Sequence, residues 1–186
     1  MRKRAGFTLL EVIYCIAIIA IISAIMTPVF RSAKHSAQIT ASISNLHQMH
    51  IALLLYQGNQ GSGGQYNSLA SMGLPADFEQ GYDLIRELSL YKSPCGLNPS
   101  WSKEPVQIEY EYFAMTSDTP PDEAIRKFQE NTVMFTDMNC ADHGDPLHSD
   151  FLPHRGLGVQ LSGTLLNLNR PGDYLEQRWW SNNTIQ

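Results

Sequence analysis

Acidic and histidine side chains gather in one C-terminal stretch, where their types and spacing suggest metal chemistry. Seven of them lie within 18 residues: Asp137, Asp142, His143, Asp145, His148, Asp150 and His154. Aspartates at such spacing suit calcium, a hard cation with about six to eight oxygen ligands. The candidate calcium ligands are Asp137, Asp142, Asp145 and Asp150. A polar surface loop, whose aspartates form turns and helix caps, is the interpretation that we favour over any metal site.

The same stretch raises a catalytic alternative. His143, His148 and His154, together with a carboxylate, would suit zinc, and an open zinc site could activate water for hydrolysis. The spacing matches neither the EF-hand loop nor the His-Glu-x-x-His motif, and the sequence has no nucleophile elbow or phosphate-binding loop. We therefore predict a protein that is not an enzyme, with calcium as its one candidate cofactor. A membrane-tethered metal-dependent hydrolase stays open as an alternative of another class.

A second chemically unusual residue is Glu11. It is the single formal charge in the apolar run from Phe7 to Phe30, 24 residues that are long enough to span a bilayer as a helix. A carboxylate there opposes membrane insertion by roughly 2.5–3.5 kcal/mol. An intramembrane charge is by default functional and needs a partner, so we expect Glu11 to have a role in assembly.

Charge on either side of the apolar run predicts how the chain is oriented. Arg2, Lys3 and Arg4 precede the run, which favours a cytoplasmic N-terminus and an exported C-terminal part. A cleaved secretory signal has a similar start, but this run is long for one and contains Glu11. From Arg31 onward the chain has 10 Lys and Arg residues against 17 Asp and Glu residues. An acidic body without a basic stripe argues against a nucleic-acid partner.

The N-terminal residues resemble the class III signal of type IV prepilins and type II secretion pseudopilins. Residues 2–6 read Arg-Lys-Arg-Ala-Gly and residues 7–12 read Phe-Thr-Leu-Leu-Glu-Val. The resemblance implies cleavage after Gly6 by a membrane prepilin peptidase and N-methylation of the new N-terminal Phe7. It also implies that Glu11 pairs with the N-terminal amine of a neighbouring subunit. Pro28 falls where family members commonly have a proline that kinks the helix.

The rest of the chain predicts an α+β, pilin-like fold. An apolar face recurs at helical spacing after Pro28: Ile39, Ile43, Leu46, Met49, Leu53 and Tyr56. Glycines from Gly58 onward place the helix end near Gln57. Later segments alternate as strands, at 107–114, 132–136, 157–161 and 164–168, with Ser162-Gly163 as a hairpin turn and a short helix from Pro120. We expect one long helix, membrane-spanning in its first half, packed on a small antiparallel sheet.

These elements divide the chain into four parts. They are a cytoplasmic leader (1–6), a transmembrane helix (7–30), its amphipathic continuation (31–57) and a periplasmic globular domain (58–186). The domain contains Cys95 and Cys140, and the sequence leaves open whether they form a disulfide. We expect an inner-membrane, single-pass protein whose domain lies in the periplasm, or on the cell surface in an assembled fibre.

The C-terminal domain is also similar, more loosely, to major-pseudopilin-like proteins. The matching pieces are Tyr56, Pro94-Cys95, Phe135-Thr136-Asp137, His154-Arg155-Gly156 and Ser162-Gly163. The chain departs from that pattern where Pro-Cys replaces Cys-Pro and where Ser162 replaces an aspartate. The resemblance implies a structural subunit of a type II secretion pseudopilus, with a pilin of a type IV or competence pilus as the alternative. Its implied partners are itself, other pilin-like subunits, the prepilin peptidase, an inner-membrane assembly platform and the lipid bilayer.

Overall fold

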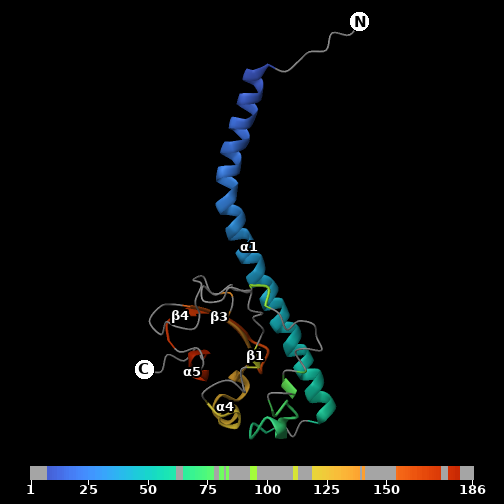
Figure 1. Cartoon of the computed structure of the whole chain (residues 1–186). Coiled ribbons are helices and arrows are strands. Elements are labelled where there is room, and N and C mark those ends of the chain that lie inside the picture. The colour runs from blue at the N-terminus through green and yellow to red at the C-terminus, as the bar shows by residue number, and fades with distance from the viewer. Residues whose placement is uncertain are drawn as a thin grey trace. The chain divides into compact units, whose positions relative to one another are not determined.

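The structure is a computed structural model, and it describes residues 8–61, 65–77, 80–81, 83, 93–95, 111–112, 119–138, 140, 154–172 and 176–180 (Figure 1). The helices are α1 (Leu9–Gln60), α4 (Pro121–Phe128) and α5 (Gln177–Trp180), with 3-10 turns η1 (Ala70–Met72) and η2 (Gln129–Asn131). The strands are β1 (Glu111–Tyr112), β2 (Val133–Asp137), β3 (His154–Gln160) and β4 (Leu165–Arg170). The chain divides into two compact units, Met1–Ala37 and Gln38–Gln186.

The first unit consists, where described, of the N-terminal part of α1. Its apolar side chains are exposed, as in Ile18 at 57% and Ile25 at 66%. The helix contains a window of mean hydropathy 2.6 that is 0% buried, so it is long and apolar enough to cross a membrane. It continues through Pro28, and the hydroxyl of Thr27 donates to the Ser23 carbonyl at 2.8 Å.

The end of α1 lies three residues beyond the predicted one, at Gln60 rather than near Gln57. A helix commonly ends at a glycine in the left-handed conformation, and here that glycine is Gly61 rather than Gly58. Gly61 has φ of 80°, and its N–H donates to the Gln57 carbonyl at 3.2 Å. Gly58 remains helical, so the first glycine of the run costs stability without ending the helix.

The second unit contains a four-stranded antiparallel sheet in the order β1-β2-β3-β4. The predicted hairpin is confirmed: β3 and β4 pair from His154↔Arg170 to Val159↔Leu165, and Gly163 in the turn has φ of 85°. The short helix predicted from Pro120 is α4. The α+β class, with a long helix packed on a small antiparallel sheet, is therefore confirmed.

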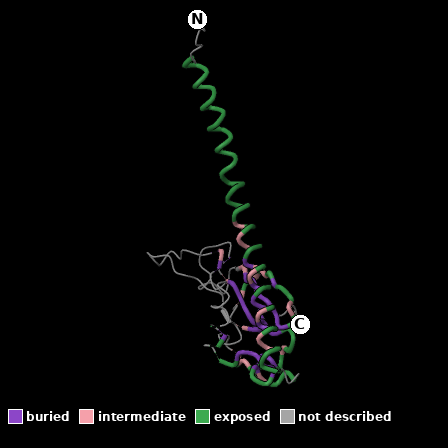
Figure 2. Tube along the Cα trace, turned by 90° about the vertical axis from the view of Figure 1, so that its right-hand side faces the viewer, coloured by how far each residue is buried: buried purple, intermediate pink, exposed green. Residues whose placement is uncertain are grey.

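One face of the sheet forms the main core with α1. The predicted apolar face of the helix supplies Leu46, Met49 and Leu53, each 0% exposed, and they cluster with Phe135 and Val159 from the sheet. Figure 2 shows the change along α1, whose trace is almost entirely exposed in the first unit and alternates between buried and exposed residues in the second. The helical period therefore identified the residues that pack on the sheet.

The opposite face of the sheet is covered by two adjacent tryptophans of α5. Trp179 and Trp180 stack edge-to-face, with ring centroids 4.7 Å apart. They fit because β3 has glycine there: a Cβ added at Gly156 would lie 2.6 Å from the Trp180 ring, and one at Gly158 would lie 2.9 Å from it. Arg170 lies over the Trp179 ring at 5.0 Å, and burial lowers the pKa of its guanidinium.

Candidate functional site

The N-terminal end of α1 holds the carboxylate that the sequence singles out. Thr8 immediately precedes the helix and Glu11 is its third residue, which is the spacing of a capping box. The Glu11 Oε2 atom accepts from the Thr8 N–H and from the Thr8 hydroxyl, both at 2.8 Å. In return the Thr8 Oγ1 atom accepts from the Glu11 N–H at 3.3 Å. The carboxylate is therefore oriented by its own chain at the start of the helix.

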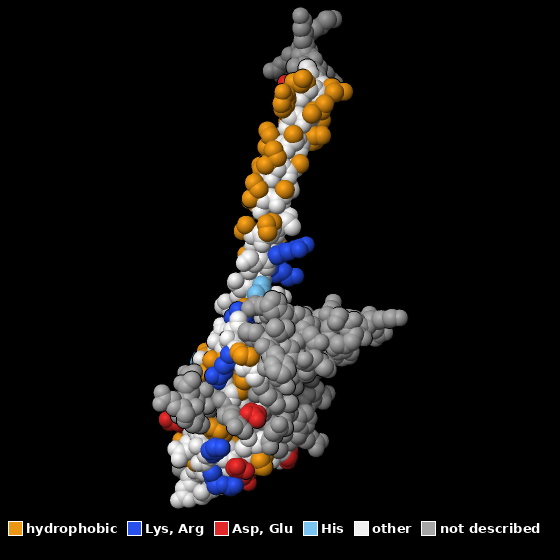
Figure 3. Space-filling view, turned by 90° about the vertical axis from the view of Figure 1, so that its left-hand side faces the viewer, with side chains coloured by type: hydrophobic (Ala, Val, Ile, Leu, Met, Phe, Trp, Pro, Cys, Tyr) orange, Lys and Arg blue, Asp and Glu red, His pale blue; other side chains and the backbone are white. Residues whose placement is uncertain are grey.

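This capping box leaves Glu11 able to bind a further donor. A carboxylate has about four lone-pair positions, and the Thr8 bonds use two of them. Figure 3 shows hydrophobic side chains covering the part of α1 that follows, with basic side chains at its far end. An acceptor at the start of an exposed apolar helix can pair with a cation from a second molecule inside a membrane or a helix bundle.

The two residues of the predicted cleavage site, Gly6 and Phe7, precede the first described residue, Thr8. Cleavage after Gly6 and N-methylation of Phe7 therefore stay predictions. Pro28 lies inside α1, and the kink expected there is likewise a prediction. The sequence reasoning missed the capping role of Thr8, although Thr-x-x-Glu before an apolar run is a recognised signal.

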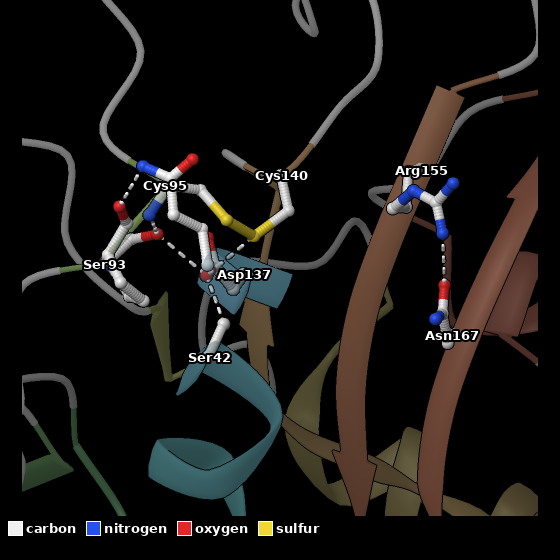
Figure 4. Close-up of a disulfide and its surroundings, with 9 residues drawn as sticks. Ser42, Ser93, Cys95, Asp137, Cys140, Arg155 and Asn167 are labelled. Carbon is white, nitrogen blue, oxygen red and sulfur yellow. Dashed lines mark hydrogen bonds between the residues drawn. A yellow bond between two sulfur atoms is a disulfide. The ribbon is translucent and has the colours of Figure 1, made fainter. Parts of the chain in front are cut away.

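A second polar site lies in the other unit, around Asp137 at the end of β2. Its Oδ2 atom accepts from the hydroxyl of Ser42 on α1 and from the hydroxyl of Ser93 at 2.7 Å (Figure 4). The Ser93 Oγ atom in turn accepts from the Cys95 N–H at 3.1 Å. Asp137 is 1% exposed and Ser42 0% exposed, so this carboxylate joins α1, β2 and residues 93–95 in the interior.

Next to Asp137, Cys95 and Cys140 form a disulfide, with Cα atoms 5.0 Å apart. The sequence left this pairing open. The Cys140 Sγ atom lies 3.7 Å from the Asp137 carboxylate, and both sulfurs are buried. The Gln38 side-chain amide of α1 donates to the Pro94 carbonyl at 2.8 Å, which further fixes this segment on the helix. We call Ser42, Ser93, Cys95, Asp137 and Cys140 the disulfide node.

The predicted calcium cluster is only partly described. Asp142, Asp145 and Asp150 lie outside the described residues, as do His143 and His148. Asp137 is buried in the disulfide node, so the interpretation of this stretch as a surface loop is wrong for that residue. His154 is the first residue of β3. Sequence reasoning missed Ser42 and Ser93, although Ser42 is a small polar residue between Ile39 and Leu46 on the buried face of α1.

Comparison with known proteins finds a match at the N-terminus of the chain. Residues 1–27 match a family model described as the prokaryotic N-terminal methylation motif, which is the signature of type IV pilins and pseudopilins. No curated protein and no solved structure matches the chain. The motif and the long apolar helix support a type IV pilin-like protein, and α1 is, among the described residues, the one helix that is long and apolar enough to cross a membrane.

Proposed function

We propose that the protein is a structural subunit of a type II secretion pseudopilus, which assembles through α1 to support protein export. The observation that carries this proposal is Glu11, a hydrogen-bonded carboxylate at the start of an exposed apolar helix within a methylation motif. The N-terminus would be cytoplasmic and residues 58–186 periplasmic, as the flanking charge favours.

Processing supplies the partner that Glu11 needs. Cleavage after Gly6 exposes the α-amine of Phe7, and methylation leaves it able to carry a positive charge. A free amine and a lone carboxylate are each costly in hydrocarbon, and pairing them between staggered subunits offsets both desolvation costs. The Thr8 hydrogen bonds support this role because they fix the direction of the carboxylate before a neighbour arrives. Glu11 would then set the register of subunits in the fibre.

A pilin of a type IV or competence pilus is the second candidate. The resemblance implies that such pilins often have a disulfide-closed loop near the C-terminus. Here Cys95 and Cys140 close a loop that precedes β3, β4 and α5. This position favours the pseudopilus over the pilus. The hydrolase alternative depends on His143, His148 and His154, of which the first two lie outside the described residues, and no described contact supports it.

The test of processing is the intact mass of the membrane-extracted full chain, co-expressed with an active or an inactivated prepilin peptidase. We expect loss of Met1 to Gly6 and one added methyl group on Phe7 with the active enzyme alone. A leader retained beside active peptidase would overturn the proposal. Deletion of the gene in its host then separates the candidates: loss of secreted proteins from the medium supports a pseudopilus, and loss of surface fibres or DNA uptake supports a pilus.

A further inference from the structure

Two cations lie on α1 directly after its apolar run. Arg31 and Lys34 are both exposed, and their spacing of three residues places them on one face of the helix. Basic side chains project from α1 where its hydrophobic side chains end (Figure 3). We call Arg31 and Lys34 the basic pair. It belongs to the first unit, together with the apolar part of the helix.

The basic pair has no anionic partner on its own helix. Glu11 is the one acidic residue of α1, and the next one along the chain is Asp77. Among the described residues, no hydrogen bond or ion pair joins the side chain of Arg31 or Lys34 to another group. Like charges three residues apart on a helix repel each other. An anion bound by both side chains would offset this repulsion.

The position of the basic pair along α1 matches the thickness of a bilayer. Arg31 follows Glu11 by 20 residues, and the helix is continuous between them, through Pro28. This length of helix rises by about 30 Å, which is also the approximate thickness of the hydrocarbon core. A helix that places Arg31 at one boundary of the core therefore places Glu11 at the other.

We propose that the basic pair binds the headgroup phosphate of an anionic phospholipid, in the leaflet where α1 leaves the membrane, and so fixes the depth of α1. Arginine and lysine at the end of a membrane helix extend their charged groups toward the headgroups. This inference rests on membrane anchoring by α1, and it holds for a pseudopilin and for a pilin alike.

The chemistry of the basic pair favours an anionic headgroup. The Arg31 guanidinium can donate two parallel N–H bonds to phosphate oxygens, and the Lys34 ammonium adds a second positive charge. A zwitterionic headgroup has a phosphate that its own ammonium group already accompanies, so its attraction to two cations is weaker. Free inorganic phosphate has the same oxygens, but it lacks the acyl chains that hold a headgroup beside the apolar run.

The fixed depth has a consequence for Glu11. A charged side chain is most costly at the bilayer centre, and the basic pair keeps Glu11 at the far boundary of the free subunit. There the Thr8 hydrogen bonds orient the carboxylate before a neighbouring subunit supplies its amine.

The test determines which lipid lies beside the basic pair. Phe30 is 73% exposed and adjacent to Arg31, so Phe30→Trp in the full chain supplies a reporter. The protein is placed in phosphatidylcholine vesicles with a minority of phosphatidylglycerol, and one of the two lipids has brominated acyl chains, which quench nearby indoles. The chain without Phe30→Trp gives the background from its own tryptophans. We expect the quenching to give phosphatidylglycerol an affinity at least about threefold higher than phosphatidylcholine, at low salt.

Variants of the reporter protein assign the site. Arg31→Gln with Lys34→Gln should abolish the preference for phosphatidylglycerol and leave quenching by phosphatidylcholine. Arg126→Gln with Lys127→Gln is the matched control, because it removes two exposed cations from α4 and should keep the preference. Inorganic phosphate should not compete at constant ionic strength, and its competition would overturn a lipid site.

Two further outcomes separate the basic pair from the membrane anchor. Equal affinity for both lipids, or a preference that survives Arg31→Gln with Lys34→Gln, would overturn the lipid site alone. Quenching by neither lipid would show that α1 does not insert, which would overturn membrane anchoring together with the lipid site.

Discussion

The two units of this protein use the same apolar residue types in opposite ways. In the first unit Ile18 is 57% exposed, whereas in the second Leu53, on the same helix, is 0% exposed. Exposed apolar area of this extent is stable only in lipid or against other apolar helices. The exposed apolar side chains of the first unit therefore suit it to membrane insertion and to packing against other helices. The second unit instead has a buried core of its own.

The carboxylates of Glu11 and Asp137, one in each unit, also differ in exposure and in the distance to their partners along the chain. Glu11 is exposed and its partner, Thr8, lies three residues away. Asp137 is buried, and its serine partners lie 95 and 44 residues away in sequence. The local hydrogen bonds orient the Glu11 carboxylate for a partner on another molecule, whereas the long-range hydrogen bonds of Asp137 hold distant segments of the second unit together. Substitutions in the two units should therefore affect different measurements.

Glu11→Val should give the largest effect on assembly, without an effect on the stability of the second unit. Insertion should stay intact or improve, because the variant removes a charge from the apolar run. The fraction of subunits in sedimentable fibres, made with the complete assembly machinery, should fall by at least about tenfold, a loss of roughly 1.4 kcal/mol per contact. Ile13→Val is the matched apolar control. Normal fibres from Glu11→Val would refute the register role.

Leu53→Ala should be the largest perturbation of stability. Its side chain is fully buried, so its removal should lower the free energy of unfolding by about 2–5 kcal/mol. Leu55→Ala, at a position 66% exposed, and Ile18→Ala, in the first unit, should each change it by less than about 0.5 kcal/mol. Urea unfolding of the full chain in micelles, followed by tryptophan fluorescence, measures all three. A large effect from Ile18→Ala would contradict the separation of the units.

Gly156→Ala should destabilise the second unit through its covered sheet face. The added Cβ would lie 2.6 Å from the Trp180 ring and 2.9 Å from the Trp179 ring, which are rigid. We expect a loss of about 1–3 kcal/mol and altered tryptophan fluorescence. Gly58→Ala is the control: nothing lies within 4 Å of its added Cβ, and helix propensity predicts a gain of about 0.5–1 kcal/mol. Equal effects would show that the indoles do not depend on β3.

These contrasts also explain what the sequence could predict. The buried face of α1, the β3–β4 hairpin and α4 rest on local patterns of period, turn and proline, which one sequence displays. The disulfide node rests on contacts between distant segments, and Ser42 on an apolar helix face was its one local sign. The packing of Trp179 on β3 has a similar sign, because Gly156 and Gly158 alternate with Leu157 and Val159. Small residues at period two indicate a surface that another segment approaches closely.

The most local effect should come from Gln177, which completes the sheet beside β2. Within the described residues β1 pairs with β2 at Thr136 and Phe135, and does not reach Val133. There the Gln177 side chain takes the place of a strand: its Oε1 accepts from the Val133 N–H and its Nε2 donates to the Val133 carbonyl, both at 3.1 Å. Gln177 is 2% exposed, so water does not readily replace it.

Gln177→Leu should therefore leave two buried backbone groups without partners. We expect the free energy of unfolding to fall by at least about 1–3 kcal/mol, the cost of one unsatisfied buried group. Amide hydrogen exchange at Val133 should accelerate before global unfolding, since its donor bond is lost. Gln48→Leu, at an exposed position of α1, is the matched control and should leave both measurements unchanged. Unchanged exchange at Val133 in Gln177→Leu would show that the edge of β2 is protected by another segment.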